Sequence, residues 1–127
     1  MKNFEWVSRK KVDEIATIYE SNITLNKSAT TYLEKSYIVL LGLDKERQLI
    51  AIKPIRKGDT ELEYTPKEKR HNITIKSSYS RISNKRFIEE IAEMINLDFE
   101  ENNYYKFNCY WSDSDQSLII DLNKGEN

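Results

Sequence analysis

The chain has very few of the residues on which covalent cross-links, metal centres and phosphate loops depend. Among its 127 residues there are one cysteine, one histidine, two prolines and three glycines. A single cysteine, Cys109, cannot form an internal disulfide, and Cys109 with His71 is too small a ligand set for a zinc site. The glycines are isolated from one another, which excludes a glycine-rich phosphate loop. We therefore expect no cofactor.

Long apolar segments are also missing. The longest apolar run, residues 38–41, is far shorter than the roughly 20 residues needed to span a bilayer. Residues 1–15 lack the apolar centre of a signal peptide. These absences predict a protein without a membrane partner, and the lone cysteine fits a cytoplasmic location.

What the chain does contain is typical of a folded domain. Hydrophobic residues make up 39% of the sequence, aromatic residues 11% and charged residues 32%, with a formal net charge of −1. Disordered chains have few aromatics and a large net charge, so we expect residues 1–127 to form one domain. Because proteins that bind nucleic acid often carry a net positive field, such binding here requires a local basic patch.

Residues 16–55 have the pattern of a strand, a short helix and a hairpin. The pattern predicts strands at residues 16–19 and 23–25, a turn at 20–22, a helix ending near 34–36, and hairpin strands at 37–43 and 48–54. Asn26 is the predicted N-cap, because its side-chain oxygen can accept from free amides of the first helical turn.

The return strand of this hairpin is apolar on both faces. Ile50 and Ile52 lie on one face, and Leu49 and Ala51 on the other. This pattern favours burial on two sides, either inside a small closed barrel or between two copies in a homodimer, and the sequence leaves both open. Pro54 is expected to end the strand pairing because it has no amide to donate.

Residues 73–122 repeat the same order of elements after a charged linker, residues 56–72, which we expect to be an exposed loop. A strand is predicted from residue 73 through residue 82, followed by Ser83 as N-cap, a helix at 84–95, strands at 105–111 and 117–122, and a polar tail at 123–127. Residues 1–15 are predicted to form an arm whose aromatic residues pack on the core, with its charges in water.

The two hairpins align at one constant offset. The matched pairs are Tyr37 with Tyr105, Val39 with Phe107, Leu41 with Cys109, Leu43 with Trp111, Gln48 with Gln116, Ile50 with Leu118, and Ile52 with Ile120. This alignment predicts an α+β domain, mainly β, that is a tandem repeat of strand, short helix and β-hairpin with two pseudo-symmetric halves.

One stretch resembles a known family. Residues 23–29 (ITLNKSA), Leu33, residues 37–39 (YIV) and residues 50–54 (IAIKP) resemble the AbrB/MazE swapped-hairpin domain, and two such units in one chain resemble MraZ. The resemblance implies an interlocked β-barrel that acts as a DNA-binding regulator or antitoxin. The chain departs from the family at Asn26, where the family has a proline, and at Asn22 and Thr24, where an arginine is common.

The chain is also similar to small uncharacterised proteins of phages and mobile elements in AT-rich bacteria. That similarity implies no particular activity.

The candidate nucleic-acid-binding residues are basic. They are Arg9, Lys10, Lys11, Lys27, Arg81, Lys85 and Arg86. Lys27 and the Lys85-Arg86 pair are placed by the repeat at equivalent helix N-termini, where their charges add to free amides that bind phosphate. Scattered solubilising lysines are the alternative interpretation. Tyrosines 64, 104 and 105 are candidates for stacking on bases.

Other residues have plainer interpretations. Cys109 with His71 is conceivable as a nucleophilic pair, but Cys109 matches Leu41 in the repeat and is expected to be a core residue. Asp113 and Asp115 could hold a cation, although Asp is also simply a turn residue.

We expect no enzyme. The first function hypothesis is a small DNA-binding regulatory protein. The alternative is a protein–protein interaction or accessory module of a phage or mobile element, using exposed tyrosines and the acidic surface of the second helix.

Overall fold

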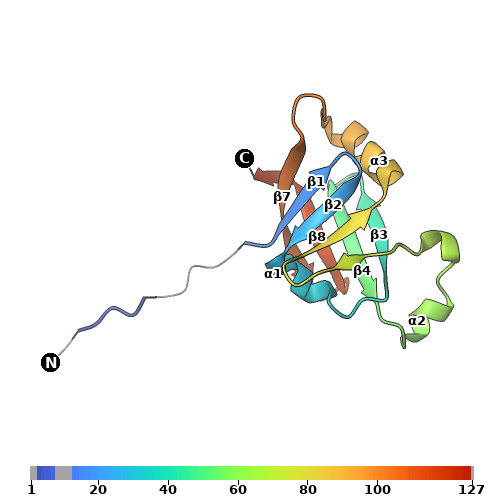
Figure 1. Cartoon of the computed structure of the whole chain (residues 1–127), viewed down its shortest axis with the longest axis horizontal. Helices are drawn as coiled ribbons and strands as arrows, with labels where there is room; N and C mark the ends of the chain where they lie inside the picture. Colours follow the sequence, from blue (N-terminus) through green and yellow to red (C-terminus); the bar gives the residue numbers. More distant parts are fainter. Residues whose placement is uncertain (1–2, 8–12, 127) are drawn as a thin grey trace.

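One antiparallel sheet curls around an apolar core and forms most of the protein (Figure 1). The computed structural model describes residues 3–7 and 13–126. The strands are β1 (Ile15–Tyr19), β2 (Asn22–Asn26), β3 (Ile38–Asp44), β4 (Leu49–Ile55), β5 (Thr74–Ile75), β6 (Tyr79–Ser83), β7 (Tyr104–Ser112) and β8 (Ser117–Glu126). The helical segments are α1 (Lys27–Thr30), η1 (Thr31–Leu33), α2 (Thr60–Glu63), η2 (Lys67–Lys69) and α3 (Lys85–Ile95). The predicted mainly β, α+β class is confirmed.

The order of strands across the sheet differs from their order in the chain. It runs β3-β4-β8-β7-β1-β2-β6-β5, so β4 pairs with β8, β7 with β1, and β2 with β6. At the open edge, Val39 of β3 exchanges backbone hydrogen bonds of 2.9 and 3.0 Å with His71, just before β5. The two edges of the sheet therefore approach each other, which gives the sheet its curled, half-barrel form.

Strand alternation places the apolar side chains on the concave side of the sheet. Ile50 and Ile52 of β4 meet Ile120 and Leu118 of β8 in direct register, and all four side chains are fully buried. Successive strand residues point to opposite faces, so every second residue contributes to this core. On the other face of β4, Leu49 and Ala51 are only half-buried.

The predicted caps and hairpins agree largely with the structure. Asn26 caps α1, since its Oδ1 accepts from the Ala29 amide at 3.1 Å. For α3 the prediction of Ser83 as N-cap is wrong: Asn84 Oδ1 accepts from the Phe87 amide at 3.0 Å, one residue later. Strand β4 also runs one residue past Pro54. The missing amide costs no ladder bond there, because pairing with β8 has ended at Ile52.

Three other predictions are corrected by tertiary contacts. Residues 73–82 form not one strand but the β5–β6 hairpin, closed by a Lys76 amide that donates to the Tyr79 carbonyl at 2.8 Å. The linker 56–72 contains α2 and η2, and its Thr65 is buried. The predicted polar tail continues β8 to Glu126, since residues 125 and 126 pair with β7.

The N-terminal arm does not pack on the core in the way predicted. Residues 3–7 extend away from the sheet (Figure 1), and the side chains of Trp6 and Val7 are 88% and 96% exposed.

None of the helices in the described ranges, residues 3–7 and 13–126, has the length and apolar character needed to cross a membrane.

The corrected helix cap leads to a stability prediction. Replacing Asn84 with Ala removes the side chain that satisfies a free amide of α3, and we expect it to lower the free energy of unfolding by about 1 kcal/mol. Replacing Ser83, which is exposed and one residue earlier, should change it by less than about 0.5 kcal/mol. Urea unfolding followed by circular dichroism measures both, and a larger loss in Ser83→Ala would restore the original prediction.

Candidate functional site

The convex side of strands β7, β1, β2 and β6 carries a continuous set of polar and aromatic side chains. Because alternate residues of these strands fill the core, the residues between them must face outward. The side chains on this surface, which we call the outer face, are Thr17, Tyr19, Asn22, Thr24, Tyr79, Arg81, Tyr104 and Lys106.

Strand register aligns part of the outer face into one row. Lys106 is paired with Thr17, Thr17 with Thr24, and Thr24 with Arg81. Neighbouring strands lie about 4.8 Å apart, so the Lys106 and Arg81 backbones are separated by roughly 14 Å. Two cations, carried by β6 and β7, thus flank a pair of small hydroxyl residues.

Aromatic rings lie beside both cations. The Arg81 guanidinium carbon is 5.3 Å from the centre of the Tyr79 ring, and Lys106 Nζ is 5.6 Å from that of Tyr104. The Tyr104 ring in turn lies 5.8 Å from the ring of Tyr19. Contact with a ring face restrains a long cationic side chain while its charged end stays accessible.

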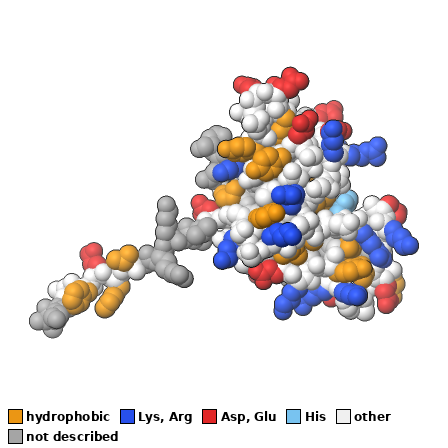
Figure 2. Space-filling view, in the orientation of Figure 1, with side chains coloured by type: hydrophobic (Ala, Val, Ile, Leu, Met, Phe, Trp, Pro, Cys, Tyr) orange, Lys and Arg blue, Asp and Glu red, His pale blue; other side chains and the backbone are white. Residues whose placement is uncertain are grey.

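The outer face also has no negative charge of its own. The described residues of β7, β1, β2 and β6 include neither Asp nor Glu, although the chain has 21 acidic residues. In Figure 2 the centre of this surface shows blue and orange side chains, and the red ones lie toward its margins. These four strands therefore carry cations and no carboxylate, although Glu126 of the adjacent strand β8 is the sheet partner of Lys106.

The structure separates the basic residues that the sequence singled out. Arg81 lies on the outer face, whereas Lys27 opens α1 and Lys85 opens α3. Because β2 and β6 are antiparallel, the helices that follow them begin at opposite ends of the strand pair. Arg86 lies beside Lys85 in the first turn of α3, and Arg9, Lys10 and Lys11 fall outside the described residues.

Only one of the three tyrosines proposed for base stacking lies on the outer face, namely Tyr104. Tyr64 lies apart, 83% exposed after α2. Tyr105 faces the core side, and its hydroxyl donates to the Asp98 carbonyl at 3.0 Å. Sequence reasoning missed Tyr19 and Lys106, whose only signal was their alternation with buried residues along β1 and β7.

The residues that the sequence offered for catalysis or metal binding are Cys109, His71, Asp113 and Asp115, and each has its own surroundings in the structure. Cys109 is buried in β7, while the His71 side chain lies 3.3 Å from the Asn84 amide nitrogen. Burial lowers the pKa of His71. Within residues 3–7 and 13–126, no group of three or more His, Cys, Asp or Glu side chains is placed to hold a metal ion. In the second hairpin loop, Asp113 accepts from Trp111 Nε1 and Asp115 from Ser112 Oγ, which are turn interactions.

Comparison of the chain with family models, with curated proteins and with solved structures finds no match.

The environment of Cys109 makes a chemical prediction. Burial, with a smaller contribution from the Glu14 charge, raises the pKa of the thiol to about 12, against about 8.5 in an unfolded chain. At pH 8.5 we expect iodoacetamide to label the native protein far more slowly than the protein in denaturant, as measured by mass spectrometry.

The raised pKa of Cys109 also makes the free energy of unfolding depend on pH. Because the folded pKa is the higher one, the contribution of Cys109 is complete below about pH 8.5 and is lost as the pH rises toward the folded value. Rapid labelling of the native protein would contradict the buried, protonated thiol and would return Cys109 to consideration as a nucleophile.

Proposed function

We propose that this chain is a small, non-enzymatic DNA-binding regulatory protein that contacts DNA through the outer face. We propose further that its fold is a duplicated swapped-hairpin barrel, resembling AbrB-like regulators, in which one chain supplies both halves.

Strand order supports the duplication. Let each of β1 to β4 be exchanged with its counterpart in β5 to β8. The exchange turns the sheet order into β7-β8-β4-β3-β5-β6-β2-β1. Read backward and closed into a ring, this order has the same neighbouring strands as the observed order closed into a ring. The bridge from Val39 to His71 lies where this ring would close. Such invariance is expected of a pseudo-two-fold arrangement in which the hairpins of each half pair with the other half.

The geometry of the two hairpin loops supports the duplication independently. Gln48 and Gln116, which the repeat aligns, both have left-handed backbone, with φ of 57° and 49°. Left-handed backbone is uncommon for residues other than glycine. Each loop is also braced the same way: the Arg47 amide donates to Asp44 Oδ1 at 2.9 Å, and the Asp115 amide to Ser112 Oγ at 3.3 Å.

The interlocked halves predict fragment complementation. We expect fragments 1–58 and 59–127 to be largely unfolded when separate, because each leaves strands without partners, and to regain cooperative unfolding when mixed. Circular dichroism with thermal melting measures this. A fragment carrying Ile52→Asp is the control and should not assemble, since Ile52 is fully buried. Either fragment folding alone as a monomer would contradict the interlock.

The function proposal is carried by the outer face, where Arg81 and Lys106 lie in one row among tyrosines, on strands that contain no Asp or Glu. Cations at this spacing suit contacts with separate phosphates, which supply most of the affinity in protein–DNA complexes. Between them, the Thr17 hydroxyl can donate to a further phosphate oxygen, whereas the Thr24 hydroxyl donates to Asn22 Oδ1 at 2.8 Å. The accessible rings of Tyr19 and Tyr104 can pack on sugars or bases.

This proposal predicts which basic residues matter. Fluorescence anisotropy with labelled duplex and single-stranded DNA should show binding that weakens steeply with added salt. The variant Arg81→Glu with Lys106→Glu should lose at least about tenfold in affinity and reduce the salt slope by about two. The matched control is Lys27→Glu with Lys85→Glu, which makes the same change of net charge at the two helix N-termini.

The pair of variants separates the outcomes. A larger loss in the control would move the interface to the helix N-termini, and equal losses would indicate non-specific attraction. No binding of either DNA at micromolar protein in low salt would overturn the proposal.

The N-terminal arm favours a second candidate function, a protein-interaction or accessory module. Trp6 and Val7 are almost fully exposed on an extended segment, and exposed apolar side chains of this kind commonly mark contact sites. A protein partner that is retained by Arg81→Glu with Lys106→Glu and lost by Trp6→Ala would favour this candidate.

A further inference from the structure

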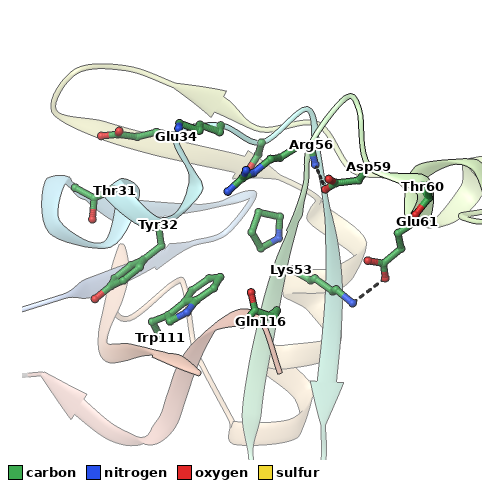
Figure 3. A pocket seen from close by; sticks show the side chains of 13 residues that line it. Thr31, Tyr32, Glu34, Lys53, Arg56, Asp59, Thr60, Glu61, Trp111 and Gln116 are labelled. Atoms are coloured by element: carbon green, nitrogen blue, oxygen red, sulfur yellow. Dashed lines mark hydrogen bonds and ion pairs between the residues drawn. The ribbon is translucent and has the colours of Figure 1, made fainter. Parts of the chain in front are cut away.

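A pocket of about 650 Å³ lies between η1, the end of β4, the start of α2 and the end of the second hairpin (Figure 3). This volume is within the range of sites that enclose one small molecule, roughly 300–1,000 Å³. Trp111 and Gln116 come from one hairpin, and the other lining residues come from residues 31–61. The pocket is separate from the outer face, with which it shares no residue.

One wall of the pocket is a pair of stacked rings. The rings of Tyr32 and Trp111 are nearly parallel, at 6°, with centres 5.3 Å apart. The Tyr32 hydroxyl donates to Glu14 Oε1 at 2.6 Å, and Trp111 Nε1 donates to Asp113 Oδ1 at 3.1 Å. With both polar ends held, the rings present a rigid, flat apolar surface, which in Figure 3 lies across the pocket from Lys53 and Glu61.

Two of the charged side chains around the pocket form an ion pair with each other. Lys53 Nζ lies 2.7 Å from Glu61 Oε1, and Asp59 Oδ2 accepts from the Arg56 amide at 2.8 Å. The side chains of Arg56 and Lys35 form no ion pair with the described residues. Glu34 and Asp59 likewise form no ion pair with the described residues, so the lining carries three cations and three carboxylates. Arg56 and Lys35 are the two lining cations available to an anion.

A buried hydroxyl group points to a missing partner at the same place. Ser36 Oγ is the one buried side-chain nitrogen or oxygen atom, among the described residues, that has no hydrogen-bond partner. Ser36 also lines the pocket. Because a buried hydroxyl without a partner costs free energy, unpaired groups of this kind mark places where a further molecule can bind.

We propose that this pocket binds a free mononucleotide, with the base against the Tyr32–Trp111 wall, the phosphate at Arg56 and Lys35, and a hydrogen bond to Ser36. A planar apolar surface beside unpaired cations matches the two parts of such a ligand. The volume is sufficient for one nucleotide, and the proposal is for the free molecule. The site does not depend on the outer face.

The test is a titration of the full chain with AMP by isothermal calorimetry and by tryptophan fluorescence. The chain has two tryptophans, so the Trp6→Phe background leaves Trp111 as the reporter. We expect saturable quenching of Trp111 with one site per chain, and competition by inorganic phosphate at higher concentration. Arg56→Gln should raise the Kd by at least about tenfold, since a charge-assisted hydrogen bond is lost.

Matched variants make the test specific. Arg47→Gln removes the same charge in the first hairpin loop, where Arg47 pairs with Asp44 and does not line the pocket, and it should leave the Kd unchanged. Ser36→Ala should raise the Kd by about threefold to tenfold without lowering the unfolding midpoint.

Three results would overturn the proposal. These are no AMP binding at millimolar concentration, equal weakening by Arg56→Gln and Arg47→Gln, or adenosine binding as tightly as AMP. The DNA-binding proposal fails separately, because Arg81→Glu with Lys106→Glu should keep its AMP affinity. A short single-stranded oligonucleotide that displaces AMP more effectively than phosphate does would instead assign the pocket to nucleic acid and would overturn the free-nucleotide assignment.

Discussion

The pairing of β4 with β8 is the contact on which the rest of the structure depends. It sets Ile50 opposite Ile120 and Ile52 opposite Leu118, all fully buried, and it joins two strands that are far apart in the chain. An isolated hairpin is marginally stable in water because it cannot cover its own apolar face. Here the two hairpins pair edge to edge through β4 and β8, and their buried side chains contribute to one core.

The core and the outer face are two consequences of the same strand pairing. The register that buries Ile18, Ile23 and Ile82 also sends Tyr19, Thr24 and Arg81 outward. A shift of one residue in any of these strands would bury polar side chains and expose apolar ones. The surface proposed to contact DNA is therefore held in place by the free energy of burying the core, and its residues need few contacts with one another.

Local features could be predicted from the sequence because they depend on neighbours in the chain. The hairpins around residues 44–48 and 112–116, the helix with Phe87, Ile88 and Ile91 on one face, and the Asn26 cap all follow from spacing and turn chemistry. The β5–β6 hairpin and the extension of β8 to Glu126 were missed. Short or polar strands form because a partner strand is already present. The residue pattern of the strand itself does not indicate that partner.

By itself the amino-acid sequence determined the mainly β class, the alternation of inward and outward residues, and the presence of only one cysteine and one histidine. Only the tertiary structure decided which outward residues become neighbours. It placed Lys106 in a row with Arg81, moved Lys27 and Lys85 to opposite ends of a strand pair, and stacked Tyr32 on Trp111. The physical reason is that a period of two residues fixes the face of each side chain. Which strands lie side by side depends on burying apolar surface from the whole chain.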